Sequence, residues 1–481
     1  MSQPSNEPPP HDADFWVPGT IALKDLHRPK EEVMLHPVPT TNPNDPLNWA
    51  AWRKHLNFSL VSFYVLLTFV QLDIGFTAWG QYQDELNFSI DLLNAGAAIN
   101  YGGLAIGCIF FVPLVHRYGR RPVYLLSTLL QLVSCVWFAV THTRADFIGS
   151  NLITIADLFF IHRHALMNGW YLFFTFTGAY LGPVASGYIV EGQGWRWMWW
   201  WCVILFGVNL VLVVFLFEES KFINGVEPTP TPTQSAGDDK HSVAQVERGR
   251  SAVRIDRSIP LAGYQQRMAW SQAAGRTCCT TFATYLFSEP YNFTAAGVGL
   301  MNVAPFIGTF PGIFLGGWMN DKSIVWLARR NGGIYEPEMR LWLALPMAVI
   351  TPAGILMCGV GLAYGSPWPL VAVGYGIFGF GLVVAGDIAL SYAMDCYHDI
   401  IGNALVGVIF TRNAFSVVVL FALTPWISGM GLRNVHILVS MLCFAILLIP
   451  VILLIWGKKF RAASAKAYMS YARRQPTHRD V

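Results

Sequence analysis

The sequence predicts an all-α polytopic membrane protein with twelve nominal spans in two six-helix halves. Of its 481 residues, 54% are hydrophobic and 13% are charged, against about 25% charged residues in soluble domains. The mean hydropathy of +0.42 agrees with this class. A short basic stretch at Val112–Tyr124, VPLVHRYGRRPVY, separates two long apolar runs, and a related stretch at Gly316–Lys322, GGWMNDK, recurs later. Two copies of one connection predict a chain built as a repeat.

The charge distribution and the cysteine spacing limit the classes of binding partner and cofactor that we expect. The net charge is +3, and the basic residues are scattered between apolar runs, so we expect no nucleic-acid partner. The eight cysteines have neither metal-ligand spacing nor the pattern of a secreted disulfide framework. We therefore expect no metal and no cofactor. The expected partners are the lipid bilayer, a small-molecule substrate and protons, and we expect a monomer.

The first segment, residues 1–55, is predicted to be a disordered cytoplasmic tail. Met1–Asn48 is rich in proline and charge and has no apolar core, so we expect no cleavable signal in it. The tail ends in PNDPLNWAAWRK at Pro43–Lys54. Its tryptophans and cations suit the inner membrane interface.

Residues 56–217 form the predicted N-terminal half. An acidic connection at Gln83–Asp91 holds a glycosylation sequon at Asn87. It lies between Lys54 and Arg117 with no Lys or Arg intervening, so we place it outside. The predicted spans of this half, apart from the fourth, are Leu56–Tyr82, Leu92–Leu114, Val123–Val140, Met167–Val190 and Trp197–Phe217.

Two crossings are predicted to be truncated. Span 4 has room only at Phe147–Ile161, and span 7 only at Thr277–Glu289. Both stretches are shorter than the roughly 20 residues that a full crossing needs. Topology nevertheless requires a crossing at both places, because it places the second sequon, at Asn292, outside.

A basic linker at residues 218–276 is predicted to join the halves on the cytoplasmic side, because it is low in complexity and rich in arginine. Residues 277–456 form the C-terminal half, and residues 457–481 form a cytoplasmic tail with several lysines and arginines. Both termini are thus expected inside. The remaining predicted spans are Gly297–Trp318, Leu341–Leu362, Leu370–Ala393, Ala404–Leu423 and Val435–Trp456.

Several motifs between Asn44 and Trp456 resemble the major facilitator superfamily. RYGRRPV resembles its inner-loop signature GxLaDrxGrrx, and GGWMNDK resembles the same signature in the second half. GAYLGPVASG at Gly178–Gly187 is similar to the antiporter motif GxxxGPxxG of the twelve-span drug:proton antiporter branch. NDPLNWAAWRK, ARRNGGIYEPEMRLW and YAMDCY resemble a fungal branch of that family.

The resemblance assigns residues to each motif. His116 stands where the first signature usually has Asp, and Val112 stands where it has Gly. The second copy keeps both residues, as Gly317 and Asp321. The span-4 motif, with its buried Arg, has no match here. The remaining assigned residues are Arg117, Gly119, Arg120 and Arg121 in the first signature and Gly178, Gly182, Pro183 and Gly187 in the antiporter motif.

Two carboxylates inside predicted spans are candidates for proton or cation coupling. Asp73, close to Gln71, lies in span 1, and Asp387 lies in span 10. Charges within a bilayer are costly and usually face a cavity or a partner. The alternative for Asp73 is contact with water near the outer interface.

Other polar residues are candidates for a central cavity. Arg412 in span 11 either pairs with an acidic residue or binds an anionic substrate group. Asn100, Tyr101, Tyr180 and Asn302 either line the cavity or hydrogen-bond between helices.

The glycines recur at small-xxx-small spacing, for example Gly308, Gly312 and Gly316, which lets helices approach closely. Their role is either static packing or, with Pro183 bending span 5, support of rocking between halves. The loop arginines are explained by positive-inside topology, by capping of helix ends, or by the latch that the family uses.

Together these features predict a secondary active transporter, not an enzyme, that moves drug-like compounds or organic cations by proton antiport and alternating access. Proton-coupled uptake of an organic cation, or a transport-inactive or sensor form, are the alternatives. An embedded enzyme is disfavoured because His162 and His164 lack a partner cluster. We expect a multi-pass protein of the plasma membrane, with the vacuolar membrane as the alternative.

Overall fold

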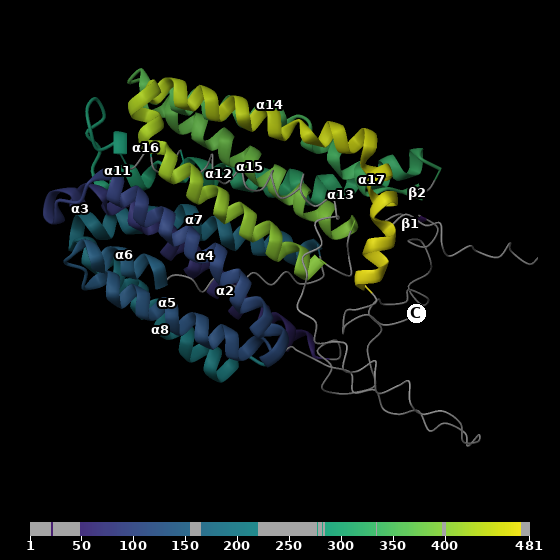
Figure 1. The fold of residues 1–481 in the computed structure, drawn as a ribbon, viewed down its shortest axis with the longest axis horizontal. Helices are drawn as coiled ribbons and strands as arrows, with labels where there is room; N and C mark the ends of the chain where they lie inside the picture. The colour runs from purple at the N-terminus through teal and green to yellow at the C-terminus, as the bar shows by residue number, and fades with distance from the viewer. Residues whose placement is uncertain are drawn as a thin grey trace, which may run out of the picture.

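The computed structural model describes residues 21–22, 49–153, 165–219, 277, 281, 284–332, 334–396 and 401–472. These residues form an all-α membrane fold. In Figure 1 the N-terminal helices, purple to teal, lie beside the C-terminal helices, green to yellow, with their long axes roughly aligned. The N-terminal elements are α2 (Ala51–Asp73), η2 (Ile74–Ala78), α3 (Trp79–Leu86), α4 (Ile90–Tyr118), α5 (Arg120–Ala139), α6 (Arg144–Ile153), α7 (Ala165–Gln193) and α8 (Trp195–Leu216).

The first helices of the C-terminal half are interrupted by a π-helical segment and a 3₁₀-helical segment. Its elements are α11 (Ala295–Leu300), α12 (Val303–Phe314), the π-helical turn η4 (Leu315–Met319), α13 (Asn320–Arg330), η5 (Pro337–Ala344), α14 (Met347–Ala363), α15 (Trp368–Cys396), α16 (Ile401–Leu447) and α17 (Ile449–Ala472).

We name the two ends of the bundle. The loop end carries Gly119 and α13. The far end carries α3 and the start of α11 (Figure 1). Asn87 and Asn292, the two sequon residues, are exposed at the far end, and both have a positive φ, 50° and 47°. Both predicted glycan acceptors therefore face the same side.

Eight stretches of the described residues are helical, long and apolar enough to cross a membrane. One of them, Ile409–Ala465, has 57 residues and would be about 85 Å long as a straight helix, against a hydrocarbon core of about 30 Å. Its chain reverses at Gly431, where φ is 77°. Predicted spans 11 and 12 are therefore joined at Gly431, within a segment that is otherwise helical.

Both predicted short crossings are described only in part. Helix α6 covers Arg144–Ile153, and residues 154–161 of predicted span 4 lie outside the described residues. In predicted span 7, Thr284 and Tyr285 are helical and residues 286–291 form bends and turns. The helix thus ends before Glu289, because Phe293 N–H donates to the Leu286 carbonyl and closes a loop.

The chain ends contact the C-terminal half at the loop end. Ile21–Ala22 (β1), within the predicted disordered tail, pairs antiparallel with Ile334–Tyr335 (β2). Helix α17 continues into the predicted tail, where Arg461 is 2% exposed. Its Nε donates to Glu338 Oε1 at 2.8 Å. A run of cations does not by itself indicate such burial.

Helix α7 makes its closest approaches at glycines. A Cβ at Gly178 would lie 2.4 Å from the Leu66 carbonyl oxygen of α2. A Cβ at Gly187 would lie 2.6 Å from the Ala295 carbonyl oxygen of α11. On α11 itself, a Cβ at Gly299 would lie 2.5 Å from the Pro183 carbonyl oxygen. The glycines of the antiporter-like motif thus join α7 to both halves. We call these contacts the α7 seam.

Replacing Gly178 by alanine should lower the apparent melting temperature in detergent, because the added methyl group collides with main chain that cannot rotate away. Overpacking of this kind costs about 1–3 kcal/mol. The matched control is Gly192→Ala on the same helix, where a Cβ meets nothing within 4 Å. Equal melting temperatures for the two variants would contradict the close approach of α7 to α2.

Candidate functional site

Four of the predicted polar residues gather where α2 meets α4. Asp73, the last residue of α2, is 3% exposed, and its Oδ1 accepts a hydrogen bond from the Tyr101 hydroxyl at 3.4 Å. Gln71 and Asn100 line a small cavity beside them. The structure therefore places Gln71, Asp73, Asn100 and Tyr101 in one region of the N-terminal half.

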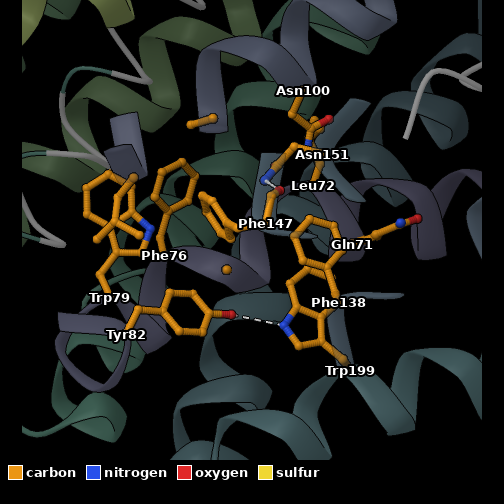
Figure 2. A pocket seen from close by; sticks show the side chains of 13 residues that line it. Gln71, Leu72, Phe76, Trp79, Tyr82, Asn100, Phe138, Phe147, Asn151 and Trp199 are labelled. Carbon is orange, nitrogen blue, oxygen red and sulfur yellow. Dashed lines mark hydrogen bonds between the residues drawn. The ribbon is translucent and has the colours of Figure 1, made fainter. Parts of the chain in front are cut away.

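The described wall of this cavity comes entirely from the N-terminal half. Six of the 13 lining residues are aromatic, and Figure 2 shows these side chains around the open space. Asn151 of the short helix α6 also lines it, with its amide donating to the Phe147 carbonyl at 2.7 Å. The aromatic residues of the wall are Phe76, Trp79, Tyr82, Phe138, Phe147 and Trp199.

A second group of polar residues lies where the halves meet. The rings of Tyr180 on α7 and Tyr375 on α15 are edge-on, with centroids 6.4 Å apart. The Tyr375 hydroxyl donates to Asn302 Oδ1 at 3.4 Å. Tyr180 and Asn302 are thus linked through Tyr375. The sequence did not single out Tyr375, which lies in a glycine-rich run like several others.

Asp387 belongs to neither group. It is 5% exposed on α15 and faces the π-helical turn η4, where a Cβ at Gly316 would lie 3.0 Å from Asp387 Oδ2. The charged groups that act on it are Arg340 and Asp321 at the loop end. Gly316 therefore leaves room for a buried carboxylate beside a helical defect, and such defects often mark functional sites.

Arg412 is buried on α16, which packs along α4 across the two halves. Its main-chain oxygen accepts from the Ser416 hydroxyl at 3.1 Å. Near the far end of the same helix pair, Asn94 Nδ2 donates to Thr424 Oγ1 at 2.9 Å. The predicted polar residues thus occupy several places and do not form one cluster.

The first copy of the loop signature is a turn of one residue. Helix α4 ends at Tyr118 and α5 begins at Arg120, with Gly119 between them at φ 96°. His116 and Arg117 therefore lie in the last turn of α4, not in an open loop. The side chain of His116 lies outside the described residues.

Glu219 caps this turn, although the sequence gave no indication of it. Its carboxylate accepts the main-chain N–H groups of Arg120 at 3.0 Å and Arg121 at 2.9 Å. These are the first two residues of α5, where N–H groups lack partners within the helix and the helix dipole favours a negative charge. The Arg121 guanidinium donates to the Val214 carbonyl at 2.7 Å, near the end of α8.

The second copy of the signature is an ion-pair network. Arg340 Nη1 lies 2.9 Å from Asp321 Oδ1, and Arg340 also pairs with Asp395. The Tyr335 hydroxyl donates to the same Asp395 carboxylate. Burial raises the pKa of Tyr335 above its usual value, and the negative charge of Asp395 raises it further. Asp321 of the second copy thus pairs with Arg340, whereas in the first copy Glu219 caps the turn.

Comparison with known proteins decides the family. The sequence profile of the Major Facilitator Superfamily matches residues 58–420. The chain belongs to the Major Facilitator Superfamily. Membership agrees with the two helical halves and supports membrane transport of small molecules, which is a non-enzymatic role.

The chain is similar along most of its length to several fungal proteins. An uncharacterized MFS-type transporter of Schizosaccharomyces pombe is 29% identical, covering 92% of this chain and 90% of the relative. Protein HOL1 of Saccharomyces cerevisiae is 27% identical, covering 94% of each chain. The MFS transporter cpaT of Aspergillus oryzae is 25% identical, covering 88% of this chain and 91% of the relative.

The first two alignments run over 524 and 554 positions. Both exceed the 481 residues of this chain, so these relatives carry internal residues that have no counterpart here. Among solved structures, a POT family transporter in complex with 5-aminolevulinic acid has a TM-score of 0.58 and 12% identity, covering 87% of this chain and 99% of that chain. This likeness supports the major facilitator fold.

Replacing Gly119 by alanine should lower the melting temperature more than replacing Gly194 by alanine. Both glycines join two helices with φ near 90°, so both variants carry the same backbone strain of about 1–3 kcal/mol. A Cβ at Gly119 would also lie 2.5 Å from Glu219 Oε2, whereas one at Gly194 meets nothing within 4 Å.

When Glu219→Ala is present in both variants, Gly119→Ala and Gly194→Ala should lower the melting temperature equally, because the added methyl group at residue 119 then has no side chain to collide with. A Gly119→Ala variant that melts at the same temperature as Gly194→Ala would contradict the capping role of Glu219.

Proposed function

We propose that this chain is a proton-coupled antiporter of small organic molecules, either drug-like compounds or organic cations, that works by alternating access. The observation that carries the proposal is a buried carboxylate in each half, Asp73 at 3% and Asp387 at 5% exposure. A carboxylate in a membrane-embedded site can lose its charge by taking up a proton. Two such groups can therefore exchange protons as the site opens to either side.

The α7 seam supports the antiport part of the proposal. Gly178 and Gly182 pack α7 against α2 in the N-terminal half, and Gly187 packs it against α11 in the C-terminal half. Close packing on both sides of Pro183 lets one rigid helix follow the rocking of the halves while excluding water. This motif resembles that of the drug:proton antiporter branch.

Proton-coupled uptake of an organic cation uses the same two carboxylates and differs in direction. A transport-inactive or sensor form stays the other alternative, because the sequence leaves only Phe147–Ile161 for the fourth crossing, less than the roughly 20 residues that a full crossing needs. We place the protein in the plasma membrane, with the vacuolar membrane as the alternative, as a monomer with both termini in the cytoplasm.

Proteoliposomes with an imposed pH gradient test the proposal. The chain should accumulate a labelled organic cation only while the gradient is present. Asp387→Asn should lower the gradient-driven flux at least tenfold, because the amide cannot carry a proton. It should retain exchange of labelled for unlabelled substrate in the absence of a gradient.

The matched control is Asp84→Asn, the same chemical change at an exposed residue of α3, and its flux should equal that of the wild type. Absence of gradient-dependent flux for every cation tested would contradict both coupled modes. If exchange is also absent, the inactive form is the correct assignment.

A further inference from the structure

The apolar segment that ends in α13 is longer than the hydrocarbon core of a membrane. It runs from Ala295 at the far end to Arg330 at the loop end and has 36 residues. A straight helix of that length would extend about 54 Å, whereas the hydrocarbon core is about 30 Å thick. Helix α13, the last part of the segment, therefore extends into the layer of lipid headgroups on the loop-end side.

Helix α13 has one face on the protein and one face away from it. Ile324 and Ala328 are buried in a cluster with Tyr335 and Met339. The exposed residues of α13 recur at helical spacing, so they form a single stripe along the helix. We call this stripe the α13 outer face, and its residues are Asp321, Lys322, Val325, Trp326, Arg329 and Arg330.

Cations and indole rings lie together on this side of the helix. Lys322 Nζ lies 3.9 Å from the centroid of the Trp318 ring on η4, and Arg330 Cζ lies 3.9 Å from that of Trp326. The two tryptophans are 52% and 53% exposed. Tryptophan favours the boundary between hydrocarbon and headgroups, and long basic side chains reach from there to the phosphates. Interfacial helices with this composition are attracted to anionic lipids.

The charge of the α13 outer face is positive. In the described part of the chain, Lys322, Arg329 and Arg330 form no salt bridge. The acidic residue of the face, Asp321, has its Oδ1 2.9 Å from Arg340 Nη1, so its negative charge is already balanced by a cation outside the face. The described residues thus leave three positive charges on the face uncompensated, and such charges attract a negatively charged surface.

We propose that the α13 outer face binds the headgroups of anionic phospholipids in the leaflet at the loop end. Lys322, Arg329 and Arg330 donate hydrogen bonds to the headgroup oxygens, and Trp318 and Trp326 lie against the upper part of the acyl chains. A zwitterionic headgroup binds more weakly, because its own cation offsets the charge of its phosphate. Binding at this face does not depend on the proposed antiport, since it needs neither a substrate nor movement of one half against the other.

Titration of the purified full-length chain in detergent with phospholipid tests the proposal, with native mass spectrometry as the readout. The chain should bind phosphatidylglycerol at least fivefold more tightly than phosphatidylcholine. Arg330→Gln should weaken the tightest phosphatidylglycerol site about fivefold, which is the effect of one cation near an anionic lipid surface. Changing Lys322, Arg329 and Arg330 together to glutamine should weaken it at least tenfold and leave phosphatidylcholine binding unchanged.

The matched control is Arg433→Gln. Arg433 also lies over an exposed ring, with its Cζ 5.6 Å from the centroid of Tyr364. It belongs to the far end, where a Cβ at Gly365 would lie 3.1 Å from Pro290, so phosphatidylglycerol affinity should equal that of the unaltered chain. Arg330→Gln and Arg433→Gln each remove one cation from an aromatic ring, so a general effect of lower net charge would be the same in both.

A competition on the unaltered chain separates a lipid from a free phosphate, so that this result does not depend on a variant folding. Glycerol 3-phosphate in tenfold excess should not displace phosphatidylglycerol, because it has no acyl chains to lie against the indole rings. Displacement would overturn the proposal, as would equal affinity of the unaltered chain for the two lipids or equal affinity of the Arg330→Gln and Arg433→Gln variants. Lipid preference in a chain without proton-coupled flux would support this site and contradict only the antiport.

Discussion

Close contact of helix α7 with both halves is the constraint on which the rest of the structure depends. Lipid tails are as apolar as leucine side chains, so burial of apolar surface cannot hold membrane helices together. Van der Waals packing must supply the attraction between helices, and this attraction grows as their main chains come closer. Gly178 permits this approach to α2, and Gly187 and Gly299 permit it to α11. The same principle recurs where Gly308 and Gly312 bring α12 against α15.

Polar groups divide the molecule into regions with different tasks. At the loop end, charges are paired and fix helix ends, as with Glu219 on α5 and Arg340 between Asp321 and Asp395. Deeper in the bundle, polar groups are sparse and buried, as with Asp387 beside η4 and Asn302 beside Tyr375. A transporter needs rigid ends on each half and a few costly polar groups in its interior. Both are present here.

Features of the fold that depend on local sequence patterns could be predicted from the sequence. Apolar runs predicted the all-α membrane fold, because the bilayer demands a minimum length of apolar helix. The spacing of Gly178 and Gly182 also indicated a close approach of α7 to another helix, because small residues four positions apart share one helix face, and both glycines lie against α2.

What the sequence did not reveal depends on contacts between distant residues. Glu219 caps α5 across almost 100 positions, and nothing near Glu219 marks it as a cap. Arg461 lies in a run of cations that suggested a solvated tail, yet it pairs with Glu338 in a buried site. The candidate polar residues could be named one by one from the sequence. Which of them lie in the same region depends on how each helix is rotated about its axis. Hydrophobic periodicity does not determine this rotation in spans that are apolar on every side.

The halves meet near the far end at Asn94 and Thr424, and the proposed alternating access requires them to separate there during transport. A disulfide between Asn94→Cys and Thr424→Cys tests it most directly, because those side chains are 2.9 Å apart across the two halves. Oxidation should close the bond and stop substrate exchange in proteoliposomes, and reduction should restore it. Each single variant should be unaffected by oxidant. Unchanged exchange in the fully cross-linked protein would contradict alternating access through the far end.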